Sequence, residues 1–98
     1  MARFIFTYHS AEKYTPDSDA MAAWGSWFES MGEHVEVLGN PVSDSTAIGQ
    51  VGDKTRLGGY SVVTADELEA ATVLAKGCPT LRHGGGVRVG ELEPVPGS

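Results

Sequence analysis

The stretch Leu57-Gly-Gly-Tyr-Ser-Val-Val-Thr-Ala-Asp-Glu-Leu-Glu-Ala-Ala-Thr-Val-Leu-Ala-Lys-Gly-Cys-Pro79 contains a predicted strand that continues directly into a predicted helix. Its first seven residues end in a β-branched pair, which favours a strand. Thr64 and Glu67 have the spacing of a capping box, in which two side chains satisfy amide donors at the start of a helix. Gly77 is placed for a left-handed residue after the helix, and the following proline prevents continuation. A strand joined to a helix in this way is half of a layered domain.

Length and composition indicate one globular domain. The chain has 98 residues, of which 41% are hydrophobic and 20% charged, as is typical of globular proteins. We therefore expect one domain over residues 1–98, with residues 93–98 as a frayed tail. The net charge of −6 comes from 13 acidic and 7 basic residues spread along the chain. Because nucleic acids and anionic membranes are bound by clustered basic residues, neither is expected as a partner.

Cysteine usage and the N-terminal residues favour a cytoplasmic location. The single cysteine, Cys78, excludes an internal disulfide and indicates a reducing compartment. The N-terminal apolar run is too short for a signal peptide, and no stretch approaches the roughly 20 apolar residues of a membrane span. His9, His34 and His83 are far apart in sequence, so no metal is expected. No nucleotide-binding motif is present, and no cofactor is expected.

The first half of the chain reads as a strand, a helix and a second strand. Residues 3–9 alternate in polarity, which predicts a strand. A helix is predicted from Thr15-Pro16, with Ser18 as an alternative cap, to about Ser30 or Met31, and Gly32 suits the position after it. Residues 35–38 predict a short strand. The apolar stripe of the helix, which we expect to pack on the sheet, consists of Ala20, Met21, Trp24, Trp27, Phe28 and Met31.

A long connection over residues 39–58 separates the second strand from the third. Residues 46–51 are expected to add an extended segment, with Gly52-Asp53 as a turn; the alternative is a mobile flap over a pocket. After the second helix, the tract His83-Gly84-Gly85-Gly86 is expected to be a flexible turn. Residues 87–92 alternate and predict the last strand.

This order of elements, β-α-β-β-α-β, predicts an α+β, ferredoxin-like fold with two helices on one face of an antiparallel sheet. Alternation predicts a helix-facing set of Phe4, Phe6, Tyr8, Val35, Val37, Tyr60, Val62, Val87 and Val89. The opposite set would be Arg3, Ile5, Thr7, His9, Glu36, Leu38, Ser61, Val63, Arg88 and Leu92. The second set is more apolar than a solvent-exposed sheet face usually is, which favours a homodimer joined through the sheets. The alternative is that this face is simply half-exposed to solvent.

At the level of motifs, the chain resembles the YCII-related family, in the branch that carries an Asp-Gly-Pro-Phe motif. The resemblance covers nearly the whole chain and consists of six stretches in order: Met21-Ala-Ala-Trp-Gly-Ser-Trp-Phe-Glu, Gly39-Asn-Pro-Val, Leu57-Gly-Gly-Tyr, the Thr64–Glu67 cap, Ala75-Lys-Gly-Cys-Pro and Gly86-Val-Arg-Val. It implies a dimeric α/β barrel of ferredoxin-like chains with a small-molecule pocket. Most family members have no assigned reaction, and the known activities include a dehydrochlorinase acting on a chlorinated hydroxyquinol.

Several family features are missing from this chain. The resemblance implies a catalytic His early in the first helix and an Asp before a Pro after the second. Those positions are occupied by Ala22 or Ala23 and by Cys78. The Asp-Gly-Pro-Phe motif is also absent, and Gly52-Asp53-Lys54 stands in its loop. The family's catalytic pair therefore does not transfer to this chain.

The candidate catalytic residues are His9 and Tyr60. His9 ends the first strand on the mixed face, where a histidine can act as an acid or base, although a hydrogen-bonded structural His is the more common case. Tyr60 could donate a hydrogen bond into a pocket, or be a core ring with a satisfied hydroxyl.

The candidate ligand-binding residues are Tyr8, Trp24, Asn40, Cys78 and His83. Each has a structural alternative: Trp24 as core packing, Asn40 as a turn residue before proline, and Cys78 as a buried thiol. His83 with its three glycines resembles an esterase oxyanion loop, but the nucleophile elbow that this reading requires is absent.

Two functions remain open, and the sequence does not decide whether the protein is an enzyme. The first is a small-molecule-binding homodimer of unassigned activity, which the missing catalytic pair favours. The second is a cofactor-independent enzyme, of lyase or isomerase type, that acts on a small cyclic or aromatic metabolite by proton transfer or elimination. The sequence does not specify the ligand, any higher oligomer, the role of residues 39–58, or whether Cys78 reacts.

Overall fold

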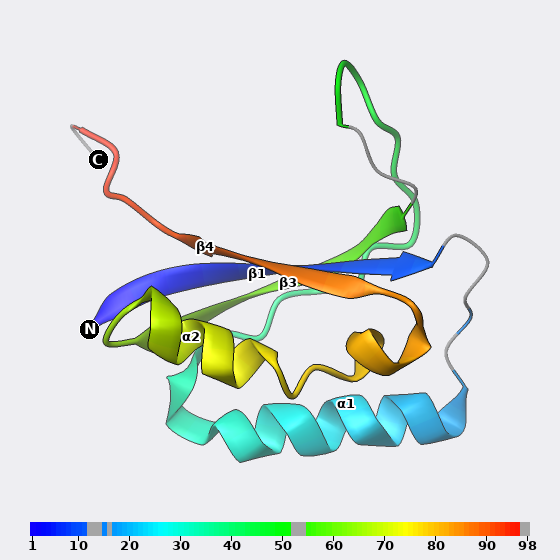
Figure 1. The fold of residues 1–98 in the computed structure, drawn as a ribbon, viewed down its shortest axis with the longest axis horizontal. Coiled ribbons are helices and arrows are strands. Elements are labelled where there is room, and N and C mark those ends of the chain that lie inside the picture. Colours follow the sequence, from blue (N-terminus) through cyan, green and yellow to red (C-terminus); the bar gives the residue numbers. More distant parts are fainter. Residues whose placement is uncertain (12–14, 16, 52–54, 97–98) are drawn as a thin grey trace.

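A four-stranded antiparallel sheet, with strand order β2-β3-β1-β4, carries both helices on one face (Figure 1). The computed structural model describes residues 1–11, 15, 17–51 and 55–96. Its elements are β1 (Ala2–Ala11), α1 (Ser18–Met31), η1 (Gly32–His34), β2 (Val35–Val37), β3 (Thr55–Ala65), α2 (Leu68–Ala75), η2 (Pro79–His83) and β4 (Gly86–Glu91), where η marks a 3₁₀ helix. The predicted ferredoxin-like α+β fold is confirmed. No helix of the described residues is long and apolar enough to cross a membrane.

The core lies between the sheet and the two helices. Phe4 and Phe6 of β1 are fully buried, and Trp27 of α1 stacks on Phe6 with ring centroids 6.1 Å apart. Small side chains on α2, Ala71 and Ala75, let this helix lie close to the sheet. The aromatic stripe predicted for α1 is thus the main contribution of that helix to the core.

Helix α1 is bounded by a side-chain cap and a glycine. Asp17 is the N-cap, rather than the alternative cap Ser18, and its carboxylate accepts a hydrogen bond from the Ala20 amide at 2.8 Å. The helix was predicted to start at Thr15-Pro16, but it begins at Ser18 and does not include Thr15; Pro16 lies outside the described residues. Gly32 follows the helix with a φ of 53°, which confirms its expected position.

Strand β3 presents the opposite face from the one predicted. Its partners across β1 are Phe4↔Val63 and Phe6↔Ser61, so Ser61 and Val63 face the helices. Tyr60 and Val62, predicted there, pair with outward-facing residues of β1. Both alternating sets of this strand contain a valine, so hydrophobicity alone does not select the face. The polar Ser61 is accommodated in the core because both of its hydrogen bonds are made inside the protein.

Strand β2 also differs from the prediction. Val35 pairs with the inward-facing Val63, but a register shift brings Val37 opposite Val62, and Val37 is 40% exposed. Both valines were predicted to face the helices. A local irregularity of this kind in a three-residue edge strand breaks the simple alternation.

The junction between β3 and α2 corrects two further predictions. Thr64 lies within β3, and Glu67 is the N-cap of α2 without a side-chain cap hydrogen bond, so no capping box forms. Gly77 does not have a positive φ. A Cβ at Gly77 would lie 3.0 Å from the indole of Trp27, so this glycine serves close packing rather than a left-handed turn.

The segment between β2 and β3 forms no strand over residues 42–51, although an extended segment was expected at 46–51. Pro41 forms an isolated bridge with Gly59, which ties the start of the connection to β3. The following residues project from the sheet on the side away from the helices (Figure 1), and Ile48 is 86% exposed. The expected Gly52-Asp53 turn lies outside the described residues.

The glycine tract after η2 forms a turn, as predicted, and one of its glycines, Gly85, is closely packed. Gly84 adopts a φ of 76° as the C-cap of η2. The amide of Gly85 donates to the Thr80 carbonyl at 3.1 Å, and a Cβ at Gly85 would lie 2.3 Å from the His9 carbonyl oxygen. Gly86 starts β4.

Candidate functional site

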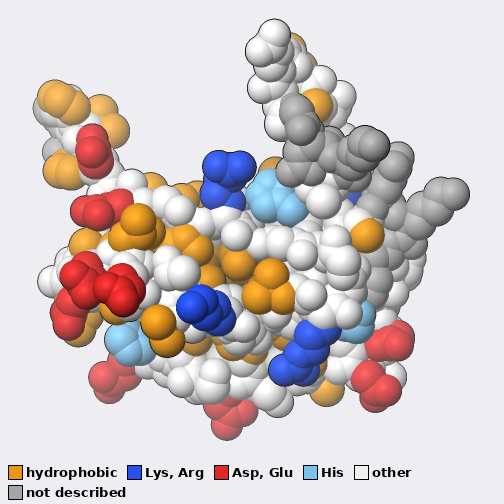
Figure 2. Space-filling view, viewed as in Figure 1, with side chains coloured by type: hydrophobic (Ala, Val, Ile, Leu, Met, Phe, Trp, Pro, Cys, Tyr) orange, Lys and Arg blue, Asp and Glu red, His pale blue; other side chains and the backbone are white. Residues whose placement is uncertain are grey.

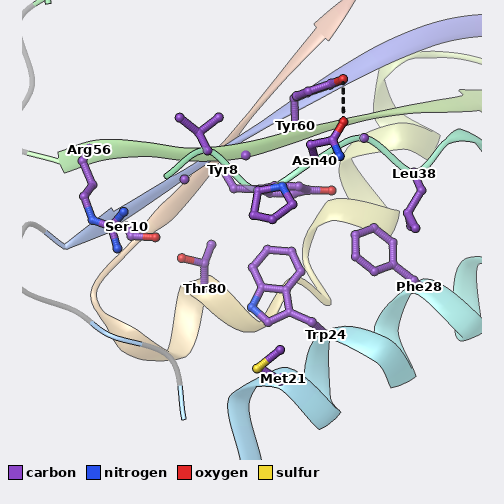
Figure 3. A pocket seen from close by; sticks show the side chains of 15 residues that line it. Tyr8, Ser10, Met21, Trp24, Phe28, Leu38, Asn40, Arg56, Tyr60 and Thr80 are labelled. Carbon is purple, nitrogen blue, oxygen red and sulfur yellow. Dashed lines mark hydrogen bonds between the residues drawn. The ribbon is translucent and has the colours of Figure 1, made fainter. Parts of the chain in front are cut away.

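A cavity of about 380 Å³ lies beside α1, under the segment that follows β2 (Figure 3). Helix α1 forms one wall, the ends of β1 and β3 form the floor, and residues 38–42 form the outer wall. Its size is within the ordinary range for small-molecule sites. The lining residues are Tyr8, Ser10, Met21, Trp24, Phe28, Leu38, Gly39, Asn40, Pro41, Val42, Arg56, Gly58, Gly59, Tyr60 and Thr80.

Aromatic rings dominate the helix side of this cavity. The Tyr8 and Trp24 rings meet edge to face with centroids 4.7 Å apart, and Trp24 lies 5.8 Å from Phe28. Trp24 in turn packs edge-on against the buried Trp27, at 5.6 Å. Because the surrounding rings hold Trp24 in place, it presents a pre-positioned surface for another flat ring.

The outer wall is held by hydrogen bonds to β3. The Val42 amide donates to the Gly58 carbonyl at 2.9 Å, and the Ser61 hydroxyl donates to the Leu38 carbonyl at 2.6 Å. At Gly59, an added Cβ would lie 3.0 Å from the Asn40 carbonyl oxygen. The glycine therefore permits the close approach that places this segment over the cavity.

A buried hydroxyl chain connects the floor to the outer wall. Tyr8 donates to the Ser61 oxygen at 2.8 Å, and Ser61 passes the chain on to Leu38. Burial raises the pKa of the Tyr8 phenol above its ordinary value, partly offset by the Ser61 hydrogen bond. Tyr8 is therefore a neutral hydrogen-bonding group at physiological pH and a poor general base.

One end of the cavity is polar. Figure 3 shows the side chains of Ser10, Arg56 and Thr80 on the same side of Trp24, away from Phe28 and Leu38. Arg56 is the only Lys or Arg among the described lining residues, which include no His, Asp, Glu or Cys. The cavity thus offers an aromatic surface, four hydroxyl groups and one positive charge.

Four of the predicted site residues line this cavity: Tyr8, Trp24, Asn40 and Tyr60. The Tyr60 hydroxyl donates to the Asn40 side-chain oxygen at 3.4 Å, and Figure 3 shows this pair across β3 from Trp24. The pair therefore lies at the rim, near the outward face of the sheet.

The other three predicted residues lie elsewhere. His9 points to the outward face of the sheet, where its Nε2 is 2.9 Å from the Thr7 hydroxyl. Cys78 is 1% exposed in the core, and burial raises its pKa to about 11, so it is a thiol at neutral pH. His83 is exposed at the end of η2 and does not line the cavity.

Several cavity residues were not predicted from the sequence. Met21 and Phe28 were assigned to core packing, yet Met21 is 67% exposed and both line the cavity. The breadth of the apolar stripe on this helix is the signal that could have indicated them. Ser10, Arg56 and Thr80 carry no sequence signal, because only the strand register brings them together.

Charged residues give no sign of a second site. Among the described residues, no group of three or more His, Cys, Asp or Glu could hold a metal ion. On the face shown in Figure 2, the Lys and Arg side chains of the described residues are scattered rather than joined into a stripe. The exposed ion pair of Arg3 and Glu36, at 2.6 Å, lies on the outward face of the sheet.

Comparison with known proteins supports the fold and identifies no family. No protein-family model matches the chain, and no curated protein sequence matches it. Among solved structures, the chain is similar to 5-chloro-2-hydroxyhydroquinone dehydrochlorinase from Burkholderia phenoliruptrix AC1100, in complex with 2,5-dihydroxybenzoquinone. The TM-score is 0.57 at 17% identity, and the match covers 93% of this chain and 95% of that chain. This likeness confirms the fold. It supports the family resemblance at the level of the fold alone.

Proposed function

We propose that the protein binds a small aromatic compound in the cavity beside α1, as a YCII-related protein without the family's catalytic pair. The observation that carries this proposal is the aromatic wall of Tyr8, Trp24 and Phe28 facing a cavity of about 380 Å³. The fold neighbour was solved with a six-membered-ring quinone, which fits the same ligand class. The absence of acid and base residues among the described lining residues supports binding without catalysis.

The test reduces the volume of the cavity with a larger side chain. Val42 is half-buried and lines the outer wall, so Val42→Phe adds a ring inside the cavity. Val51 is 62% exposed on the projecting segment, and Val51→Phe is the matched control. Binding of phenol, catechol and benzoate is measured by titration calorimetry. We expect Val42→Phe to weaken the binding at least roughly tenfold, with the control unchanged. Absence of binding by the whole panel, or equal binding to both variants, would contradict the proposal.

The same proposal includes a homodimer joined through the outward sheet faces. Ile5 and Val62 pair at the centre of this face, and Leu57 and Tyr60 are each 37% exposed on it. Ile5→Glu should give a species of the 10.3 kDa chain mass by light scattering at micromolar concentration, whereas wild type should have twice that mass. Val73→Glu, on the 61% exposed outer side of α2, is the control and should stay dimeric. A monomeric wild type would refute the dimer.

A cofactor-independent enzyme is the second candidate. The observation in its favour is that Thr7, His9 and Tyr60 share the outward face, where a sheet-to-sheet dimer would enclose them. A proton transfer or elimination there would use His9 as the base. His9→Ala and Tyr60→Phe should then abolish turnover of any substrate found, and unchanged turnover would eliminate this candidate.

A further inference from the structure

The polar end of the cavity depends on one irregularity in the sheet. Strands β1 and β3 pair residue by residue from Ala2↔Ala65 to Tyr8↔Gly59, and the register then skips Gly58. Beyond that point Ser10 pairs with Arg56. This is a β-bulge, in which two residues of one strand oppose one residue of the other.

The bulge determines the direction of Arg56. Side chains alternate between faces along a strand, so in a regular β3 Arg56 would be on the outward face, three residues from Gly59. The extra residue reverses the alternation, and Arg56 joins Tyr8 and Ser10 on the helix-facing side. The cavity lining includes it accordingly.

Glycine at the bulge leaves room for the Ser10 hydroxyl. A Cβ at Gly58 would lie 2.9 Å from the Ser10 hydroxyl oxygen and 3.5 Å from the Tyr8 carbonyl oxygen. A side chain there would therefore displace the Ser10 hydroxyl, just where Ser10 and Arg56 meet. Bulges often re-aim a side chain next to a binding site, and this one directs a guanidinium to a cavity whose other described lining residues carry no charge.

We propose that the Gly58 bulge positions Arg56 to bind the carboxylate of a single-ring aromatic acid whose ring lies against Trp24. This inference rests on the proposed function and specifies its ligand class. Figure 3 shows Arg56 and Ser10 at one end of the cavity and the Trp24 ring between that end and Phe28. A ring with one acidic substituent matches this separation of a charged end from an aromatic wall.

The chemistry of Arg56 favours a carboxylate. Its planar guanidinium binds a carboxylate through two parallel hydrogen bonds, and its five N–H donors allow it to keep a contact with the protein as well. Apolar walls strengthen the charge pair, because they exclude water. The described lining residues offer a single positive charge, which suits a monoanion better than a doubly charged phosphate.

The hydroxyls beside Arg56 can complete this recognition. Ser10 has no hydrogen-bond partner for its hydroxyl among the described residues, and Thr80 is 2% exposed with a long, 3.5 Å bond to the His9 carbonyl. Both line the cavity and can donate to a carboxylate oxygen.

The test compares acids with their uncharged amides. Benzoate with benzamide, and 4-hydroxybenzoate with 4-hydroxybenzamide, differ in charge but little in shape. Their dissociation constants are measured by titration calorimetry at neutral pH on wild type, Arg56→Gln, Arg56→Lys and Arg82→Gln. Arg82 is exposed on η2 and does not line the cavity, so its variant removes the same charge elsewhere. A circular dichroism melt of each variant confirms folding.

We expect wild type and Arg82→Gln to bind each acid at least roughly tenfold more tightly than its amide. Arg56→Gln should remove this preference and leave amide binding unchanged, and Arg56→Lys should restore part of it. Equal binding of acid and amide to wild type, or a preference that survives in Arg56→Gln, overturns the inference while the proposed function stands. If neither acids nor amides bind, the inference is overturned, and the proposed function fails as well only if phenol and catechol also do not bind.

Discussion

Replacement of Ser61 with alanine tests the link between the core and the wall of the cavity. Ser61 is fully buried, accepts a hydrogen bond from the Tyr8 hydroxyl at 2.8 Å and donates to the Leu38 carbonyl at 2.6 Å. Alanine leaves both partners without their bond. Because a buried group left unsatisfied costs roughly 1–3 kcal/mol, and Leu38 is near solvent, we expect Ser61→Ala to lower the free energy of unfolding by about 2 kcal/mol.

Two companion variants separate the bonds. Tyr8→Phe removes one bond but leaves Ser61 bonded to Leu38, so it should cost only about 1 kcal/mol, and the two changes should be non-additive in the double variant. Ser43→Ala removes an exposed hydroxyl and should change stability by less than about 0.5 kcal/mol. Urea unfolding followed by circular dichroism measures wild type and the four variants. A Ser61→Ala protein as stable as the Ser43→Ala protein would refute the inward register of β3, because an outward Ser61 would have no such role.

Two further predictions concern the packed glycine tract and the buried thiol. Gly85→Ala should destabilise the fold by at least about 2 kcal/mol, because its Cβ would lie 2.3 Å from the His9 carbonyl oxygen, whereas Gly86→Ala meets nothing within 4 Å and should be tolerated; equal melting temperatures of the two variants would show that the tract is loose. Burial raises the pKa of Cys78 to about 11. The buried, protonated thiol should therefore contribute fully to stability below the pKa of an unfolded cysteine, about 8.5, and this contribution should be lost as the pH rises toward 11. Urea unfolding should therefore show that the free energy of unfolding falls from about pH 8 to about pH 10, and that this fall is smaller in Cys78→Ala. Part of the fall should remain in that variant, because the pKa of Tyr8 is also raised. A fall of the same size in Cys78→Ala and wild type would contradict the burial of the thiol.

The order of elements, the ferredoxin-like fold and the aromatic core were predictable because they depend on local patterns. The stripe of α1, the alternation of β1 and the glycine after α1 each leave a signal within a few residues. The predicted capping box at Thr64 does not form, because β3 continues through this residue. Pairing with β1 outweighs the local capping motif.

The candidate site was less predictable, because it is set by register. Ser61 was predicted to face outward, because its two hydrogen-bond partners, Tyr8 and Leu38, lie in distant segments of the sequence. In the observed register, a regular β3 would place Arg56 outward, and only the skipped Gly58 brings it to the helix-facing side. Trp24 was identified from its residue type and position on the helical stripe, whereas His9 has suitable chemistry but lies on the other face of the sheet.

The central claim, that the cavity beside α1 binds a small aromatic molecule, is tested most directly by the two tryptophan indole signals in a nitrogen–proton correlation spectrum. Trp24 lines the cavity, while Trp27 is buried next to it with its indole N–H bonded to the Leu74 carbonyl at 3.0 Å. On titration with benzoate, the Trp24 signal should shift and saturate, and the Trp27 signal should move much less. If neither signal shifts, or if the two shift equally, the cavity is not the binding site.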